Sequence, residues 1–220
     1  MGKTFSLITC ILISIVPLVY LAIIWDTLPA IVPTHFNSAG KANGFSERSM
    51  LWVVCGGLAC LSMGMYFLMN NLHRIDPKRK GTLPSQSFTN LGKGLVLFLT
   101  VLNFAGLLAS SGHELIMTKF MIPVIGLLFV FLGNVMYSIK PNYFAGIRTP
   151  WTLTDDDNWR ATHRVAGVAM FIGGVVIVAG SLLLEGRHTK LLVLGTVVPM
   201  ILIPTVYSFW FYRRANSHNQ

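Results

Sequence analysis

Long apolar runs alternate with short polar stretches along almost the whole chain. Six of these runs are about as long as a helix that crosses a bilayer, which needs roughly 20 residues: 5–25, 50–69, 91–111, 120–139, 165–184 and 191–211. In hydrocarbon every backbone N–H and C=O must be paired within the segment, and the alternating pattern of a membrane β-barrel is absent. The pattern predicts an all-α polytopic membrane protein whose six transmembrane helices form a bundle.

The composition supports this interpretation. Hydrophobic residues make up 53% of the 220 residues, whereas the chain has only 17 Lys and Arg and 8 Asp and Glu. A soluble domain usually has about twice that charged fraction. The composition therefore excludes a disordered chain, a disulfide-stabilised secreted domain and an ordinary cytosolic enzyme.

The net charge of +9 is explained by the expected topology. Assigned to alternate sides of six spans, 12 basic residues fall on the side of both termini and 5 on the other. The richer side is expected to be cytoplasmic, so both termini are predicted inside. Because the basic residues lie in short clusters between spans, we expect contact with membrane lipids and no direct nucleic-acid partner.

Three connections between spans are long and particular in composition, so function is expected in them. They are an external stretch over 26–49, a cytoplasmic stretch over 71–90 and a cytoplasmic stretch over 140–164. The expected organisation is a two-helix membrane domain over 1–70, the cytoplasmic loop 71–90, and a four-helix membrane region over 91–220.

The 140–164 connection contains signals for a helix start. Pro150 disfavours helical geometry at Thr149, and Thr154 followed by Asp157 resembles a capping box, so a helix is predicted to begin near Asp155. On this helix, spacings of four residues place Asp156, Arg160 and Arg164 on one face, and Trp159 and His163 on another.

Two interpretations of this connection stay open. In one, it is a capped, charge-paired helix at the membrane surface with a tryptophan anchor. In the other, it forms a polar pocket or a docking surface for a protein, to which the Asp cluster and four further residues contribute: Arg148, Arg160, His163 and Arg164. A docking role predicts that Arg148→Ala and His163→Ala abolish function while stability stays nearly unchanged.

The external 26–49 stretch is expected to be ordered. Asn43-Gly44 is a strong turn signal, and Phe36 and Phe45 are able to insert into the headgroup layer. The stretch is either an amphipathic lid that stabilises the bundle or a surface that recognises an external molecule.

Signals for catalysis are weak. The sequence has no zincin, Cys-x-x-Cys, P-loop or complete dinucleotide motif, so no metal, cofactor or catalytic residue is expected. The spans contain almost no ionisable residue, although ion-coupled carriers usually keep one there. A small-molecule or lipid transporter, or an enzyme that uses Arg148, Asp157 and His163, remains the alternative to a binding protein.

Two motifs indicate a family. The stretch Gly146-Ile147-Arg148-Thr149-Pro150-Trp151-Thr152-Leu153, with Asp157, Trp159, Thr162, His163, Arg164 and Gly167 after it, resembles the signature of the SdpI family of bacterial membrane immunity proteins. The external Pro33-x-His35-Phe36-Asn37-x-x-Gly40 stretch, with Gly44-Phe45 after it, is similar to a membrane domain of unknown function that often precedes this signature. Here Glu47-Arg48 replaces a lysine expected soon after Ser46.

The resemblance implies a six-span protein of the bacterial cytoplasmic membrane that protects against a secreted antimicrobial peptide toxin. It also implies a possible signalling role, in which a cytoplasmic repressor is held at the membrane when the toxin is present. The residues expected to bind partners on the cytoplasmic side are Arg148, Thr149, Pro150, Trp151, Asp157, Trp159, Arg160, His163 and Arg164. Those expected in the external loop are His35, Phe36, Asn37, Gly40, Gly44 and Phe45.

Overall fold

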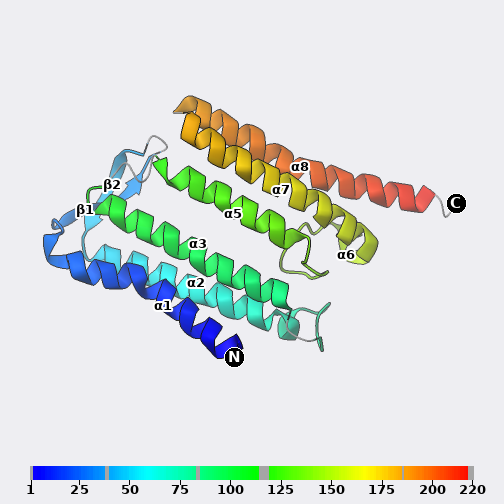
Figure 1. Cartoon of the computed structure of the whole chain (residues 1–220), viewed down its shortest axis with the longest axis horizontal. Coiled ribbons are helices and arrows are strands. Elements are labelled where there is room, and N and C mark those ends of the chain that lie inside the picture. Colours follow the sequence, from blue (N-terminus) through cyan, green and yellow to red (C-terminus); the bar gives the residue numbers. More distant parts are fainter. Residues whose placement is uncertain (1, 38–39, 83–84, 114–118, 185, 218–220) are drawn as a thin grey trace. The chain divides into compact units, whose positions relative to one another are not determined.

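The computed structural model describes residues 2–37, 40–82, 85–113, 119–184 and 186–217. In chain order its elements are α1 (Gly2–Ile24), a 3-10 turn η1 (Trp25–Thr27), β1 (Ile31–Phe36), β2 (Ala42–Glu47), α2 (Met50–Ile75), α3 (Gln86–Ser110), α5 (Met121–Met136), α6 (Pro150–Thr154), α7 (Asp156–Leu183) and α8 (Arg187–Ser217) (Figure 1).

The predicted polytopic membrane protein is confirmed. Within the described ranges, five helices are long and apolar enough to cross a membrane: α1, α2, α3, α7 and α8. The span predicted over 120–139 forms the apolar helix α5, whose 16 residues extend about 24 Å, less than a hydrocarbon core of about 30 Å. It ends early because a turn closes where the Ser138 N–H donates to the Val135 carbonyl, ahead of Pro141.

The described residues group into two compact units. The first unit comprises 1–69 and 92–124, and the second comprises 70–91 and 125–220. In the first unit, a core of buried side chains joins α1, α2 and α3 to β1: Leu21, Leu28, Val32, Leu51, Cys55 and Leu107. A smaller cluster of Cys10, Tyr66 and Val96 joins the same three helices near their other ends.

The 26–49 stretch contains a β-hairpin that apolar periodicity did not predict. β1 and β2 pair antiparallel, and the connection closes where the Asn37 N–H donates to the Lys41 carbonyl at 2.9 Å, with Gly40 at φ +72°. The turn predicted at Asn43-Gly44 is therefore wrong, because Gly44 lies inside β2, opposite His35. A Cβ at Gly44 would lie 2.8 Å from the His35 Cβ, so the glycine serves close packing rather than the turn.

In the second unit, glycines let three helices approach closely. Gly133 of α5 and Gly167 of α7 face each other, and a Cβ on Gly133 would lie 2.7 Å from the Gly167 carbonyl oxygen. One heptad away, Gly126 and Gly174 form a second contact of this kind, with 2.6 Å between a Cβ on Gly174 and the Gly126 carbonyl oxygen. Small residues at such crossings allow the backbone contacts on which helix association in membranes depends.

α7 packs against α8 as a long antiparallel pair, visible in yellow to red in Figure 1. Gly173 faces Met200 and Thr196, and Gly180 faces Leu192. The glycines of α7 therefore serve two neighbours on different faces. The first residues of α7, 156–164, belong to the 140–164 connection.

Candidate functional site

The 140–164 connection begins with a turn built around Asn142, whose side chain is fully buried. Its Nδ2 donates to the carbonyls of Lys140 and Ala145 at 2.9 Å each, and its Oδ1 accepts from the backbone N–H groups of Phe144 and Ala145. Both amide hydrogens and the carbonyl oxygen of the side chain are thus engaged. Sequence reasoning did not single out Asn142, although an Asn after a proline is typical of such side-chain-closed turns.

Asp76, from the 70–91 segment, is hydrogen-bonded to the backbone of this turn. Its carboxylate is fully buried, and Oδ2 accepts a 2.8 Å hydrogen bond from the Tyr143 N–H while Oδ1 accepts from the Lys78 N–H at 2.8 Å. Tyr143 lies 67 residues away in the chain. Asp76 therefore joins the 70–91 segment to the 140–164 connection, which are far apart in the sequence.

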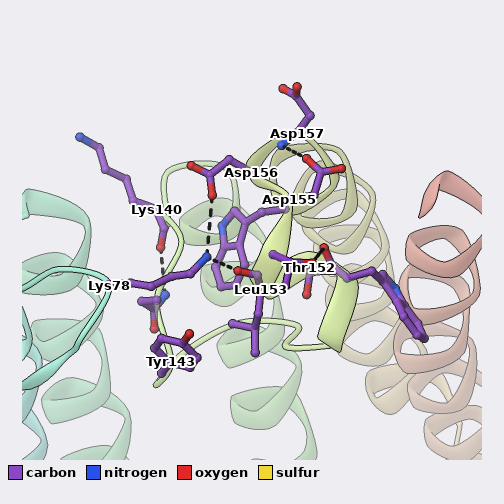
Figure 2. A network of polar contacts seen from close by, with 12 residues as sticks. Lys78, Lys140, Tyr143, Thr152, Leu153, Asp155, Asp156 and Asp157 are labelled. Atoms are coloured by element: carbon purple, nitrogen blue, oxygen red, sulfur yellow. Dashed lines mark hydrogen bonds and ion pairs between the residues drawn. The ribbon is translucent and has the colours of Figure 1, made fainter. Parts of the chain in front are cut away.

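Lys78 makes the second link between these connections. Its ammonium donates to the Leu153 carbonyl at the end of α6 and lies 3.9 Å from Oδ1 of Asp156, which is the first residue of α7 (Figure 2). Carbonyls at the end of a helix lack partners within the helix, so a cation satisfies one of them here. Sequence reasoning assigned no role to Asp76 or Lys78.

Both ring nitrogens of His163 are hydrogen-bonded to backbone groups of the connection. The Ile147 N–H donates to Nε2 at 3.1 Å, so Nε2 is unprotonated, and Nδ1 carries the proton and donates to the Trp159 carbonyl at 2.8 Å. Only 2% of His163 is exposed. The imidazole is therefore neutral and fully engaged, and it is not free to bind a partner.

Trp159 and Gly146 pack against the imidazole. Trp159 stacks on it with ring centroids 3.9 Å apart and a 17° interplanar angle, and its Nε1 donates to the Ile139 carbonyl at 2.9 Å. Gly146 has φ +108°, and a Cβ there would lie 2.2 Å from Nε2. The predicted shared face of Trp159 and His163 is confirmed. The expectation that His163→Ala leaves stability unchanged conflicts with this burial.

The short helix α6 begins with its own capping box. Thr149 is extended, with ψ 160°, and its side chain accepts from the Thr152 N–H while the Thr152 hydroxyl accepts from the Thr149 N–H. Pro150 occupies the first turn, where its missing N–H leaves no bond unmade. The helix predicted near Asp155 does begin there, but its cap is the Asp155 side chain, not Thr154, which ends α6.

Ser208 of α8 makes two hydrogen bonds with the connection. The Trp151 Nε1 donates to its Oγ at 2.7 Å, and the Asn158 side chain donates to its carbonyl at 3.0 Å. Trp151 also packs on the rings of Phe209 and Tyr212, with centroids 5.3 Å and 5.8 Å away. Asn158 and Ser208 are fully buried, and neither was identified from the sequence as a site residue.

The remaining predicted residues lie on the surface of the connection. Arg148 is exposed, and its guanidinium donates to the Tyr143 carbonyl. Arg160 pairs with Asp157, three residues before it, rather than with Asp156. Arg164 is also exposed. The structure thus separates the predicted set into a buried framework, which includes His163, and an exposed group, which includes Arg148, Asp156 and Asp157.

We call four exposed charged residues of this connection the charged face: Arg148, Asp156, Asp157 and Arg160. Within the described part of the chain, no group of three or more His, Cys, Asp or Glu side chains is placed to hold a metal ion. What these side chains offer is charge and hydrogen-bonding capacity toward another molecule.

In the first unit, the β1–β2 hairpin is fixed at its base by Arg48. Its guanidinium donates to the carbonyls of Trp25 and Leu28 at 3.0 and 3.3 Å and lies 4.7 Å from the centre of the Trp25 ring. Fully buried Val32 adds an apolar anchor. Arg48, where the sequence motif departs from expectation, is therefore a structural clamp.

The predicted external residues take different places on the hairpin. The His35 Nδ1 and the Asn43 Oδ1 are hydrogen-bonded across the strands, Asn37 and Gly40 form the turn, and Gly44 packs against His35. Phe45 is 61% exposed, and Phe36 is half-buried. Phe45 is therefore presented outward and does not anchor the loop to the first unit.

The chain is similar to known proteins over both motif regions. Residues 138–208 match the model of the SdpI/YfhL protein family, and residues 12–56 match that of a domain of unknown function, DUF1648. The chain is 25% identical over 195 residues to the immunity protein SdpI of Bacillus subtilis (strain 168), covering 88% of this chain and 89% of that protein. No solved structure matches. The two resemblances drawn from the motifs are confirmed.

Proposed function

We propose that this chain, whose residues 138–208 match the SdpI/YfhL family, belongs to that family and protects the cell that makes it against a secreted peptide toxin. It is a multi-pass protein of the bacterial cytoplasmic membrane. Its similarity to a named immunity protein extends over 88% of the chain, which supports a membrane immunity role. The proposed role comprises protection against the toxin and a signal to the cytoplasm when the toxin is present.

The observation that carries the proposal is the division of the 140–164 connection into framework and charged face. Buried Asn142, Asp76, Trp159 and His163 satisfy the fold from within. The charged face adds little to that fold, because exposed ion pairs contribute at most about 1 kcal/mol. A rigid platform with unneeded surface charge suits recognition of a cytoplasmic partner, and we propose a repressor protein as that partner.

The hairpin is the proposed contact with the toxin. It is held by Arg48 and Val32, so it is ordered before any partner arrives, and it presents Ile31 and Phe45, which are 56% and 61% exposed. Outward-facing apolar side chains beside the membrane suit an apolar or amphipathic peptide. The toxin would meet this surface at the external side in the predicted topology.

The proposal is tested by expressing the chain in a strain that lacks it and is killed by the peptide. Survival should rise in proportion to the amount of chain in the membrane. The peptides applied are those produced by the host species of the chain. If the chain is abundant in the membrane and survival still equals that of the strain without it, the proposed immunity function is wrong.

We predict that Phe36→Ala with Phe45→Ala lowers protection at least tenfold while the amount of protein stays within twofold, because Phe45 is exposed and adds little to the fold. The matched control is Phe5→Ala with Phe120→Ala, which removes two phenylalanines that are also exposed, outside the hairpin. Equal survival of the two double variants at equal abundance would reduce the hairpin to a connector.

A further inference from the structure

An apolar groove of about 660 Å³ follows the seam between α7 and α8 in the second unit. Val168, Ile172 and Val176 line it from α7, and Gly195, Pro199 and Ile203 line it from α8. The Thr196 hydroxyl, the polar side-chain group along its length, already donates to the Leu192 carbonyl at 2.7 Å. The groove therefore offers mainly hydrocarbon contact, and its Thr196 hydroxyl has already used its one donor.

The groove exists because α8 lacks a side chain where one would fill it. A Cβ added to Gly195 would meet no atom within 4 Å, whereas one added to Gly173 would lie 2.3 Å from the Met200 Sδ. Gly173 thus brings the helices together, and Gly195 leaves the space beside them open. The volume is within the range of about 300–1,000 Å³ that is typical of small-ligand sites.

The length of the groove matches one leaflet of a bilayer. Four lining residues of α7 recur every fourth position from Arg164 to Val176, so they form one stripe. Twelve residues of helix extend about 18 Å, and half of a hydrocarbon core is about 15 Å. The groove therefore suits one acyl chain that runs inward from the membrane surface.

A cation stands at the surface end of the stripe. Within the described part of the chain, the exposed guanidinium of Arg164 makes no ion pair and no hydrogen bond, whereas that of Arg160, one turn earlier, is paired with Asp157. Arginine binds phosphate through two parallel hydrogen bonds, and the cytoplasmic leaflet is rich in anionic lipids. A cation at one end and an apolar lining along the rest complement the anionic headgroup and the acyl chain of a phospholipid.

We propose that the α7–α8 groove binds one anionic glycerophospholipid, with an acyl chain along Val168, Ile172 and Val176 and the headgroup phosphate at Arg164. This site is independent of the proposed immunity function, because it needs neither a toxin nor a repressor. It assigns Arg164 to a lipid rather than to the charged face.

The test is native mass spectrometry of the purified full chain, titrated with palmitoyl-oleoyl phosphatidylglycerol or with the phosphatidylcholine of the same chains. We expect one phosphatidylglycerol to bind with preference over phosphatidylcholine. Gly195→Leu, whose Cβ meets no atom within 4 Å, adds a side chain to the lining of the groove and should weaken phosphatidylglycerol binding at least tenfold. Arg164→Gln should abolish the preference and leave phosphatidylcholine binding unchanged.

The matched control is Gly57→Leu on α2, where a Cβ also meets nothing within 4 Å and the residue is exposed. It should bind both lipids as the parent does, and circular dichroism should show equal helicity in all variants. The proposal fails if Gly195→Leu binds phosphatidylglycerol as Gly57→Leu does, or if Arg164→Gln keeps the preference. A dimer that Gly195→Leu abolishes, without bound lipid in the parent, would assign the groove to a second copy and also overturn it.

Discussion

At the scale of single residues, Gly146 and His163 depend on each other. The glycine leaves room for the imidazole and takes a left-handed conformation, and the backbone N–H that follows it donates to Nε2. A sequence indicates that His163 shares a face with Trp159, because this follows from helical spacing. It does not reveal what Nε2 accepts, because that donor belongs to a loop 16 residues earlier.

His163→Ala should destabilise the protein by about 1–3 kcal/mol, because it removes the buried imidazole and leaves the half-buried Ile147 N–H without its acceptor. Gly146→Ala should be at least as damaging, since its Cβ would overlap the imidazole. Thermal melting in detergent measures both. His163→Gln, whose side-chain oxygen is able to accept the same bond, should recover part of the loss. Melting of His163→Ala at the parent temperature would contradict the structural role.

At the scale of elements, apolar length predicted the helices well and their ends less well. α2 and α3 extend beyond the predicted runs, into the polar segments 70–75 and 86–90, whereas the start of α7 near Asp155 was predicted from its capping signals. Hydropathy locates the part of a helix in hydrocarbon, whereas polar helix ends depend on side-chain contacts such as the 2.9 Å hydrogen bond from Thr89 to Asn70. Asp76 illustrates the limit, because its partner Tyr143 is 67 residues away and no local pattern joins them.

The glycine contacts between α5 and α7 give a prediction at this scale. Gly133→Ala should lower the melting temperature and the membrane abundance, because its Cβ would lie 2.6 Å from the Phe171 nitrogen and the helices would have to separate. Overpacking of this kind costs about 1–3 kcal/mol. Gly57→Ala, with open space around its Cβ, is the control. Equal melting of the two variants would show that the crossing is looser than described.

At the scale of the whole molecule, the charge distribution predicts how the chain is inserted. The 12 to 5 division of basic residues places both termini and the 140–164 connection in the cytoplasm and the β-hairpin outside. This orientation, and the domain division at 70 and 91, stay predictions. Composition and periodicity predicted the membrane class of the fold, whereas the hairpin escaped them because its strands are short and only Val32 is buried in β1.

Reporter fusions test the orientation. A cytoplasm-dependent reporter after Arg214 should be active, and a reporter that works only outside should be active when inserted near Gly40. The opposite signals would place the 12 basic residues outside and would also move the proposed toxin contact to the wrong side.

The central claim is that the 140–164 connection consists of a buried framework that maintains the fold and a charged face that carries the function. The most direct measurement compares membrane abundance, melting temperature and toxin survival for Arg148→Gln with Asp157→Asn, for His163→Ala, and for the control Arg213→Gln, which changes an exposed arginine of α8. We predict that the charged-face variant keeps parental abundance and melting and loses survival at least tenfold, whereas His163→Ala loses survival only as its abundance falls. Survival that follows abundance in every variant would contradict the claim and leave the connection a scaffold.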